Sequence, residues 1–193
     1  MELETLLSVC LGLGLSAACG FRVFVPFLVM NLAARAGYLE LGGSFEWMAG
    51  TPALVMFAAA TVLEVGGYYV PWLDNLLDSV ATPMAAVAGV VVSASVVTGI
   101  DPAFKWPLAV IAGGGLAGAV QATTVAARAA STLATGGLAN PLVSTVEAGA
   151  SFGLTVLALI LPVVATVAVV VLFILLRRSL WRRRTATSSS DLL

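Results

Sequence analysis

Apolar residues fill five long blocks of the chain, at about residues 4–36, 52–70, 82–99, 107–134 and 141–176, separated by short polar stretches. The blocks are apolar all round, without the stripe of a surface helix or the alternation of a strand. A helix needs about 20 such residues to cross a bilayer. The pattern therefore predicts an all-α integral membrane protein with about five transmembrane helices.

The first and last blocks are too long for one straight crossing. At 1.5 Å per residue each would reach roughly 50 Å, against a hydrocarbon core of about 30 Å. The candidate break points are Gly20 and Pro26 in the first block and Gly149, Gly153 and Pro162 in the last. We expect broken or re-entrant segments near Gly20–Pro26 and Asn140–Gly153, although a long tilted helix is the alternative.

Proline-containing pairs predict where helices begin. Thr51–Pro52, Thr82–Pro83 and Asn140–Pro141 each place a capping side chain before a proline. Pro71 is expected at or just after the end of the second helix. The acidic segment that follows it, made of Asp74, Asn75 and Asp78, is then expected at the outer membrane boundary, where water is available.

Composition supports a membrane protein and narrows its chemistry. The 193 residues are 60% hydrophobic and 10% charged, with a mean hydropathy of +1.06, whereas a soluble domain carries about 25% charged residues. The net charge of −1 provides no basic field for nucleic acid. Histidine, the commonest metal ligand, is absent from the sequence. We expect no cofactor, no metal and no nucleic acid, with the lipid bilayer and a small solute or ion as partners.

Signs of an enzyme are few. Asp74 and Asp78 lie four residues apart, so on a helix they would share one face and could hold a divalent cation. Two carboxylates are few ligands, however, and the sequence has no Cys/His cluster, no G-x-S-x-G motif and no histidine for a triad. Enzymatic activity stays open, but the sequence favours a protein that is not an enzyme.

Four ionisable residues fall inside apolar blocks, namely Arg22, Glu64, Arg128 and Glu147. One such charge at a helix centre costs about 2.5–3.5 kcal/mol, so four unpaired charges would cost roughly 10 kcal/mol. We expect pairing, as Arg22–Glu64 and Arg128–Glu147 or equally across the two halves of the chain. Arg128 lies near the end of its block and could instead extend to the interface. The charges either line a solute path or lock the helices in register.

The stretch "STLATGGLANPLVSTVE" (131–147) surrounds Glu147 with hydroxyl groups and with the amide of Asn140. Gly136 and Gly137 permit a tight turn here. A polar loop that dips toward a cavity and an ordinary turn between capped helices both fit this pattern.

Lysine and arginine outside the blocks set the expected orientation in a bacterial cytoplasmic (inner) membrane. Five crossings with the arginine-rich C-terminus in the cytoplasm place the N-terminus outside, with Arg35 and Lys105 on the cytoplasmic side. Six crossings would put Arg35 and Lys105 outside, so five are favoured. Residues 1–178 are expected to form one transmembrane domain, and residues 179–193 a disordered basic and polar cytoplasmic tail.

Residues 4–99 and 107–176 are possible half-repeats. Each contains a glycine-led opening, a run of small residues, an arginine and a closing glycine, followed by a segment with one glutamate. Helices rich in alanine and glycine resemble one another easily, so the repeat is a hypothesis. If it is real, it favours a pseudo-symmetric bundle with a site at the repeat interface.

Three stretches, "GLGLSAACGFRVFVPFL", "VPWLDNLLDSVATPMAAVAG" and "STLATGGLANPLVSTVE", resemble a bacterial membrane-protein family known as domain of unknown function 4126. The resemblance covers about residues 5–176. Members often carry an acid and a lysine where this chain has Gly67 and Tyr68, and a histidine near Gln121. Ionisable groups of the family pattern are thus missing here, which weakens a proton relay built on those positions. The family name implies no activity.

Buried charges and predicted chain breaks together favour a small transporter or channel. Its polar path is expected to be lined by Arg22, Glu64, Asn140 and Glu147, with Asp74, Asn75 and Asp78 at the outer face and Arg128 as a pairing residue. The alternative is a non-catalytic membrane scaffold or lipid-interacting assembly factor, in which the charges are structural locks.

Overall fold

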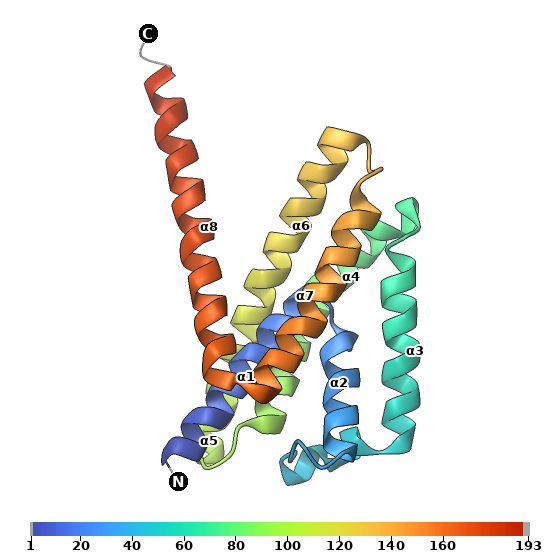
Figure 1. The fold of residues 1–193 in the computed structure, drawn as a ribbon, viewed down its shortest axis with the longest axis vertical. Coiled ribbons are helices and arrows are strands. Elements are labelled where there is room, and N and C mark those ends of the chain that lie inside the picture. The colour runs from blue at the N-terminus through green and yellow to red at the C-terminus, as the bar shows by residue number, and fades with distance from the viewer. Residues whose placement is uncertain (1, 191–193) are drawn as a thin grey trace.

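The computed structural model describes residues 2–190, apart from the side chains of residues 71–75, 176, 177 and 179–190. These residues contain no strand. The elements are α1 (Glu2–Phe21), α2 (Phe24–Arg35), the 3₁₀ helix η1 (Gly43–Ala49), α3 (Thr51–Gly67), α4 (Pro71–Val96), α5 (Pro102–Leu108), the π-helix η2 (Ala109–Gly114), α6 (Gly115–Thr135), α7 (Asn140–Ile160) and α8 (Pro162–Ser190). Figure 1 shows them as one helical bundle.

Four described segments are long and apolar enough to cross a membrane, namely Glu2–Phe21, Leu76–Val96, Pro102–Thr135 and Asn140–Ile160. A fifth crossing results if η1 and α3, which are bent by 65° to each other, act as one span. Phe24–Arg35 and Pro162–Leu175 are shorter apolar helices. The prediction of an all-α, multi-pass membrane protein is confirmed.

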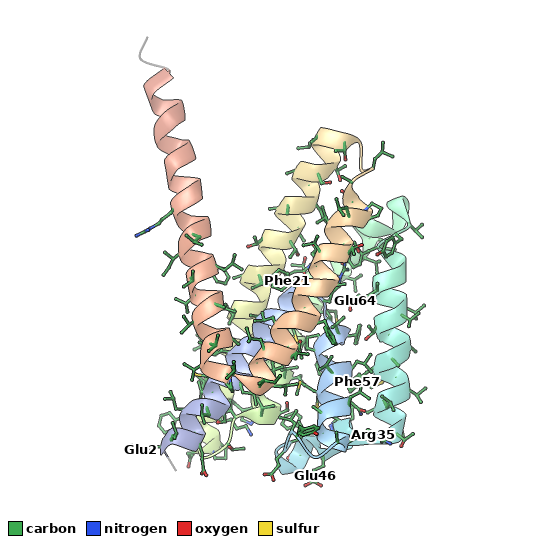
Figure 2. All side chains as sticks on the ribbon, viewed as in Figure 1. Glu2, Phe21, Arg35, Glu46, Phe57 and Glu64 are labelled. Carbon is green, nitrogen blue, oxygen red and sulfur yellow. The ribbon has the colours of Figure 1, made fainter. Side chains whose placement is uncertain are left out.

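The first apolar block is broken at Arg22 and Val23, inside the predicted interval Gly20–Pro26. Figure 1 shows α1 rising from the N-terminal end and α2 running back beside α3. Phe21, the last residue of α1, lies about midway between the two ends of the bundle (Figure 2). The block is therefore a helical hairpin that turns at mid-depth, and we call residues 22–24 the hairpin tip.

Close helix packing fixes this turn. A Cβ atom on Gly20 would lie 2.5 Å from the carbonyl oxygen of Ala117 and from Cβ of Val120, so only glycine fits where α1 crosses α6. Past the turn, Pro26 lies in the first turn of α2, where its missing N–H removes no helical hydrogen bond. Ser151 Oγ of α7 donates to the carbonyl oxygen of Ala18 at 3.0 Å, near the end of α1.

The last apolar block breaks at Pro162, one of the predicted break points, and not between Asn140 and Gly153. The expectation of a break or re-entrant segment at Asn140–Gly153 is wrong, because α7 is one helix from Asn140 to Ile160. Gly149 and Gly153 are tolerated, since a glycine weakens a helix by only about 1 kcal/mol. The chain turns at Pro162, another candidate, where Leu161 leaves helical geometry with φ −136° and ψ 71°.

The helix start predicted at Thr82–Pro83 is also wrong. Thr51–Pro52 and Asn140–Pro141 begin α3 and α7 as expected, but Thr82–Pro83 lies inside α4, which begins at Pro71. Thr82 Oγ1 donates to the carbonyl oxygen of Asp78 at 2.8 Å, one helical turn earlier. Asp78 is therefore a helical residue, and its side chain is mostly buried against Arg128. The position of Asp74, Asn75 and Asp78 at the outer membrane boundary stays a prediction.

The hairpin also changes which ends of the chain lie together. Glu2 and Arg35 lie at one end of the bundle, and α8 ends at the other (Figures 1 and 2). The sequence places Arg35 and Lys105 beside the C-terminal arginines and opposite the N-terminus. Because α2 doubles back, Arg35 lies with the N-terminus instead, and so does Lys105, whose Nζ is 6.0 Å from the centroid of the Phe45 ring in η1 (Figure 1). The predicted tail falls within α8 up to Ser190, and residues 191–193 lie outside the described part, so the disorder of the tail stays a prediction. The half-repeats also stay a prediction.

Candidate functional site

Charged side chains from five segments meet beside the hairpin tip, at the level where Figure 2 labels Glu64. The hairpin tip, α3, α4, α6 and α7 each contribute one of them. We call this group the charged cluster; it consists of Arg22, Glu64, Asp78, Arg128 and Glu147. Four of these residues are the ones that the sequence placed in the lipid zone, and Asp78 is an addition.

Glu147 holds both arginines. Its Oε2 atom lies 3.1 Å from Nη2 of Arg22 and also accepts a hydrogen bond from Nη2 of Arg128. Its Oε1 atom accepts from Nε of Arg128 at 3.2 Å, so Arg128 and Glu147 form a two-point pair. The predicted Arg128–Glu147 pair is therefore present. Arg128 does not extend to the interface, because its side chain is only 3% exposed.

Tyr68, the residue that caps the end of α3, connects the two arginines to Asp78. The guanidinium carbons of Arg22 and Arg128 lie over its ring, 3.9 and 3.7 Å from the centroid. Its hydroxyl group donates to Oδ1 of Asp78 at 3.1 Å, and Nη1 of Arg128 lies 3.0 Å from the same oxygen. Asp78 is the more exposed partner of that ion pair, at 14% for its side chain.

Glu64 binds the protein backbone. Its two carboxylate oxygens accept hydrogen bonds from the N–H groups of Val23, at 2.7 Å, and Phe24, at 3.0 Å. These groups belong to the first turn of α2, where N–H groups have no helical partner and the helix dipole is positive. Glu64 thus stabilises the hairpin tip, and the predicted Arg22–Glu64 pair is replaced by an Arg22–Glu147 pair between the two halves of the chain.

Only one nitrogen atom of the Arg22 guanidinium group has hydrogen-bond partners among the described residues. Nη2 donates to Oγ of Ser144 at 2.6 Å and to the Ser144 carbonyl oxygen at 3.1 Å, besides its contact with Glu147. Nε and Nη1 are buried and have no hydrogen-bond partner among the described residues. Such orphaned donors are rare in proteins, and a water molecule or a solute is their usual partner.

Asn140 lies two turns before Glu147, at the start of α7, outside the charged cluster. Its Nδ2 atom donates to Oγ1 of Thr132 on α6 at 2.9 Å. The turn before it contains Gly136 and Gly137 with φ of 63° and 88°, so the ordinary turn between two helices is the correct alternative here. The side chains of Asp74 and Asn75 lie outside the described part of the protein.

Two cavities adjoin the charged cluster. The larger, of about 630 Å³, lies between α4 and α6 and is lined by Asp78 and Arg128 together with hydroxyl groups. The smaller, of about 300 Å³, lies between α3 and α4 and is largely apolar, with Glu64 and Tyr68 in its wall. The α4–α6 cavity is therefore the more polar of the two.

Sequence reasoning missed Tyr68 and the inward direction of Asp78, and it placed Ser144 only among the hydroxyl groups around Glu147. Asp78 lies 14 residues after Glu64, and the signal that could have found it is Pro71, because a proline in the first helical position places Asp78 two turns into the helix. Tyr68 carried no charge and so gave no signal of its own.

Residues 9–182 match the model of a protein family described as "Domain of unknown function (DUF4126)". No curated protein and no solved structure matches the chain.

Proposed function

The chain belongs to that family, whose description names no activity, and from its own charged cluster we propose that it is a small transporter or channel for a polar solute or ion. The observation that carries the proposal is the position of the cluster at the tip of a helical hairpin that turns at mid-depth. Discontinuous helices whose ends face charged groups are how many transporters bind their substrates. Ionisable residues at membrane depth mark solute or proton pathways by default.

The elements around the cluster suit a path. A cavity of about 630 Å³ is lined by Asp78 and Arg128, and Arg128 shares Glu147 with Arg22. Arg22 in turn leads to the hairpin tip and has two nitrogen atoms without a protein partner. A polar solute that entered the cavity would therefore meet successive charged groups and orphaned donors on its way to the hairpin tip.

A structural lock is the second candidate, and one observation favours it. Both oxygens of Glu147 and both oxygens of Glu64 already have partners within the protein. A lock needs only that the pairs fix the helices in register, as buried ion pairs do in some proteins. A scaffold of this kind would lose stability when its charges are removed but would have no transport to lose.

Flux through proteoliposomes separates the two candidates. Swelling on mixing with iso-osmotic glycine, glycerol or potassium chloride reports entry of each solute. We expect the wild-type protein to admit at least one of them, and Glu64→Gln and Glu147→Gln to admit it at least about tenfold more slowly per folded molecule. Glu46→Gln is the matched control, because Glu46 is exposed at one end of the bundle, away from Glu64 (Figure 2). Wild-type flux in both cluster variants would exclude this site.

For orientation, we propose that the C-terminus lies in the bacterial cytoplasm and the N-terminus outside. Five arginines follow Leu176, whereas Arg35 and Lys105 are the basic residues of the earlier loops. Because the hairpin places Arg35 with the N-terminus, this proposal puts Arg35 outside. A fusion of green fluorescent protein to the C-terminus should fluoresce in cells; a dark but fully expressed fusion would reverse the orientation.

A further inference from the structure

The α4–α6 cavity combines groups that no other described cavity combines. It is lined by a carboxylate from Asp78, a guanidinium from Arg128 and hydroxyl groups that include Thr82 and Thr132, while Ala129 belongs to its apolar wall. Its volume of about 630 Å³ lies within the range of about 300–1,000 Å³ that is typical of small-molecule sites. The cavity therefore has room for a small solute beside two opposite charges.

The two charges in the cavity are already paired, and this restricts what could bind there. Nη1 of Arg128 lies 3.0 Å from Oδ1 of Asp78. An anion that took Arg128 would leave the Asp78 carboxylate with a weaker set of partners, and a cation that took Asp78 would do the same to Arg128. Breaking one side of a buried ion pair is costly because it strands the other charge.

A solute that carries both charges avoids this cost. Its anionic group replaces Asp78 on Arg128 while its ammonium group replaces Arg128 on Asp78, so both protein charges stay paired. Arg22, Arg128, Asp78 and Glu147 carry two positive and two negative charges, and a solute without net charge leaves that balance unchanged. Glu64 is balanced separately by the N-terminus of α2.

We infer that the α4–α6 cavity binds a small zwitterion, with its anionic group on Arg128 and its ammonium group on Asp78. The inference rests on the proposed function and names the substrate class of that site. The pairing chemistry is shared by a free amino acid and by the ethanolamine phosphate head group of a lipid. Tyr68 donates a hydrogen bond to Asp78 and lies against both arginines. Opening of the Asp78–Arg128 pair therefore changes contacts within the charged cluster.

Equilibrium binding to the full-length protein in detergent micelles tests the inference. The probes are radiolabelled glycine and glycerophosphoethanolamine, with unlabelled acetate and ethylammonium as competitors that carry only one of the two charges. We expect saturable binding of at least one zwitterion. Acetate and ethylammonium should compete with an affinity at least about tenfold weaker than that of the zwitterion. The tighter of the two zwitterions identifies the source, a free amino acid or a lipid head group. Absence of binding by either zwitterion, or equal competition by a singly charged probe, would overturn the inference.

Two variants make the test specific. Asp78→Asn should lose the preference for glycine over acetate, a ratio that does not depend on how much protein is folded. Thr82→Val should weaken zwitterion binding a few-fold. Thr123→Val is its matched control, because Thr123 is also an exposed helical threonine that donates to the carbonyl oxygen four residues earlier, at 3.0 Å, and it does not line this cavity. Equal effects of Thr82→Val and Thr123→Val, or an unchanged ratio in Asp78→Asn, would contradict the assignment.

The binding test and the flux test have distinguishable negative results. Flux of another solute without zwitterion binding would refute this inference and leave the proposed transporter intact. Zwitterion binding without flux of any solute would support the site and refute transport.

Discussion

Glu64 and Glu147 are the same residue type at similar burial, 8% and 5% exposed, yet their surroundings differ in kind. Glu64 accepts two backbone N–H groups at the hairpin tip, whereas Glu147 neutralises two guanidinium groups. The first carboxylate stabilises a chain break, and the second holds like charges together. The comparison teaches that a glutamate in an apolar block can be satisfied by a helix end as well as by an arginine.

The largest effect is expected from Glu147→Gln. The amide would leave Arg22 and Arg128 close together over the Tyr68 ring without the negative charge between them. Removing one partner from a buried ion pair typically costs about 3–5 kcal/mol. Unfolding of the purified protein in detergent measures this loss. Adding Arg22→Met to Glu147→Gln should recover part of the lost free energy of unfolding. A Glu147→Gln variant as stable as the wild type would show that Glu147 does not hold the two arginines together.

Glu64→Gln should cost less, about 1–3 kcal/mol, because one amide oxygen replaces two acceptors at the N-terminus of α2. The effect should also be local. Hydrogen exchange at the amides of Val23 and Phe24 should accelerate in Glu64→Gln and much less in Glu147→Gln. Equal acceleration in both variants would mean that the two sites are not separable.

Tyr68→Phe should have the smallest effect, about 0.5–1.5 kcal/mol, since it removes only the hydrogen bond to Asp78 and keeps the ring under both guanidinium groups. Tyr68→Leu removes the ring as well, and each desolvated cation–π contact adds up to about 2 kcal/mol. The two variants are compared by thermal unfolding in the same detergent. If Tyr68→Leu proves no less stable than Tyr68→Phe, the ring contacts contribute nothing.

Much of the fold could be predicted because lipid imposes simple rules on a sequence. Block length and the absence of charge predict apolar helices, and Gly20 and Pro26 mark a true break. The direction of the chain after that break could not be predicted. Two short helices in line and a hairpin have the same local sequence. Contacts between distant segments distinguish them, such as the packing of Gly20 against Ala117 and the hydrogen bonds of Glu64 to the hairpin tip.

Four members of the charged cluster were predicted as charges that must be paired, but Asn140 lies outside the cluster and the pairing was predicted only in part. Arg22, Arg128 and Glu147 meet as the cost of buried charge requires. Pairing by charge alone gives Glu64 an arginine partner, in its own half or in the other, because backbone N–H groups do not appear as charges in a sequence. The helical position of Asp78 could not be predicted from Thr82–Pro83, because a proline within a helix is tolerated in membrane proteins and does not always mark a helix start.

Accessibility of the charged cluster to water tests the central claim most directly. Ser144, whose Oγ lies 2.6 Å from Nη2 of Arg22, and Ser95, equally buried in α4 away from the cluster, are changed to cysteine in a Cys10→Ala/Cys19→Ala background. The rate of modification by a water-soluble methanethiosulfonate reagent is measured for each in proteoliposomes. A solute path predicts that Ser144→Cys reacts at least about tenfold faster than Ser95→Cys. If both cysteines stay unmodified, the cluster is a sealed structural lock and the transport proposal is contradicted.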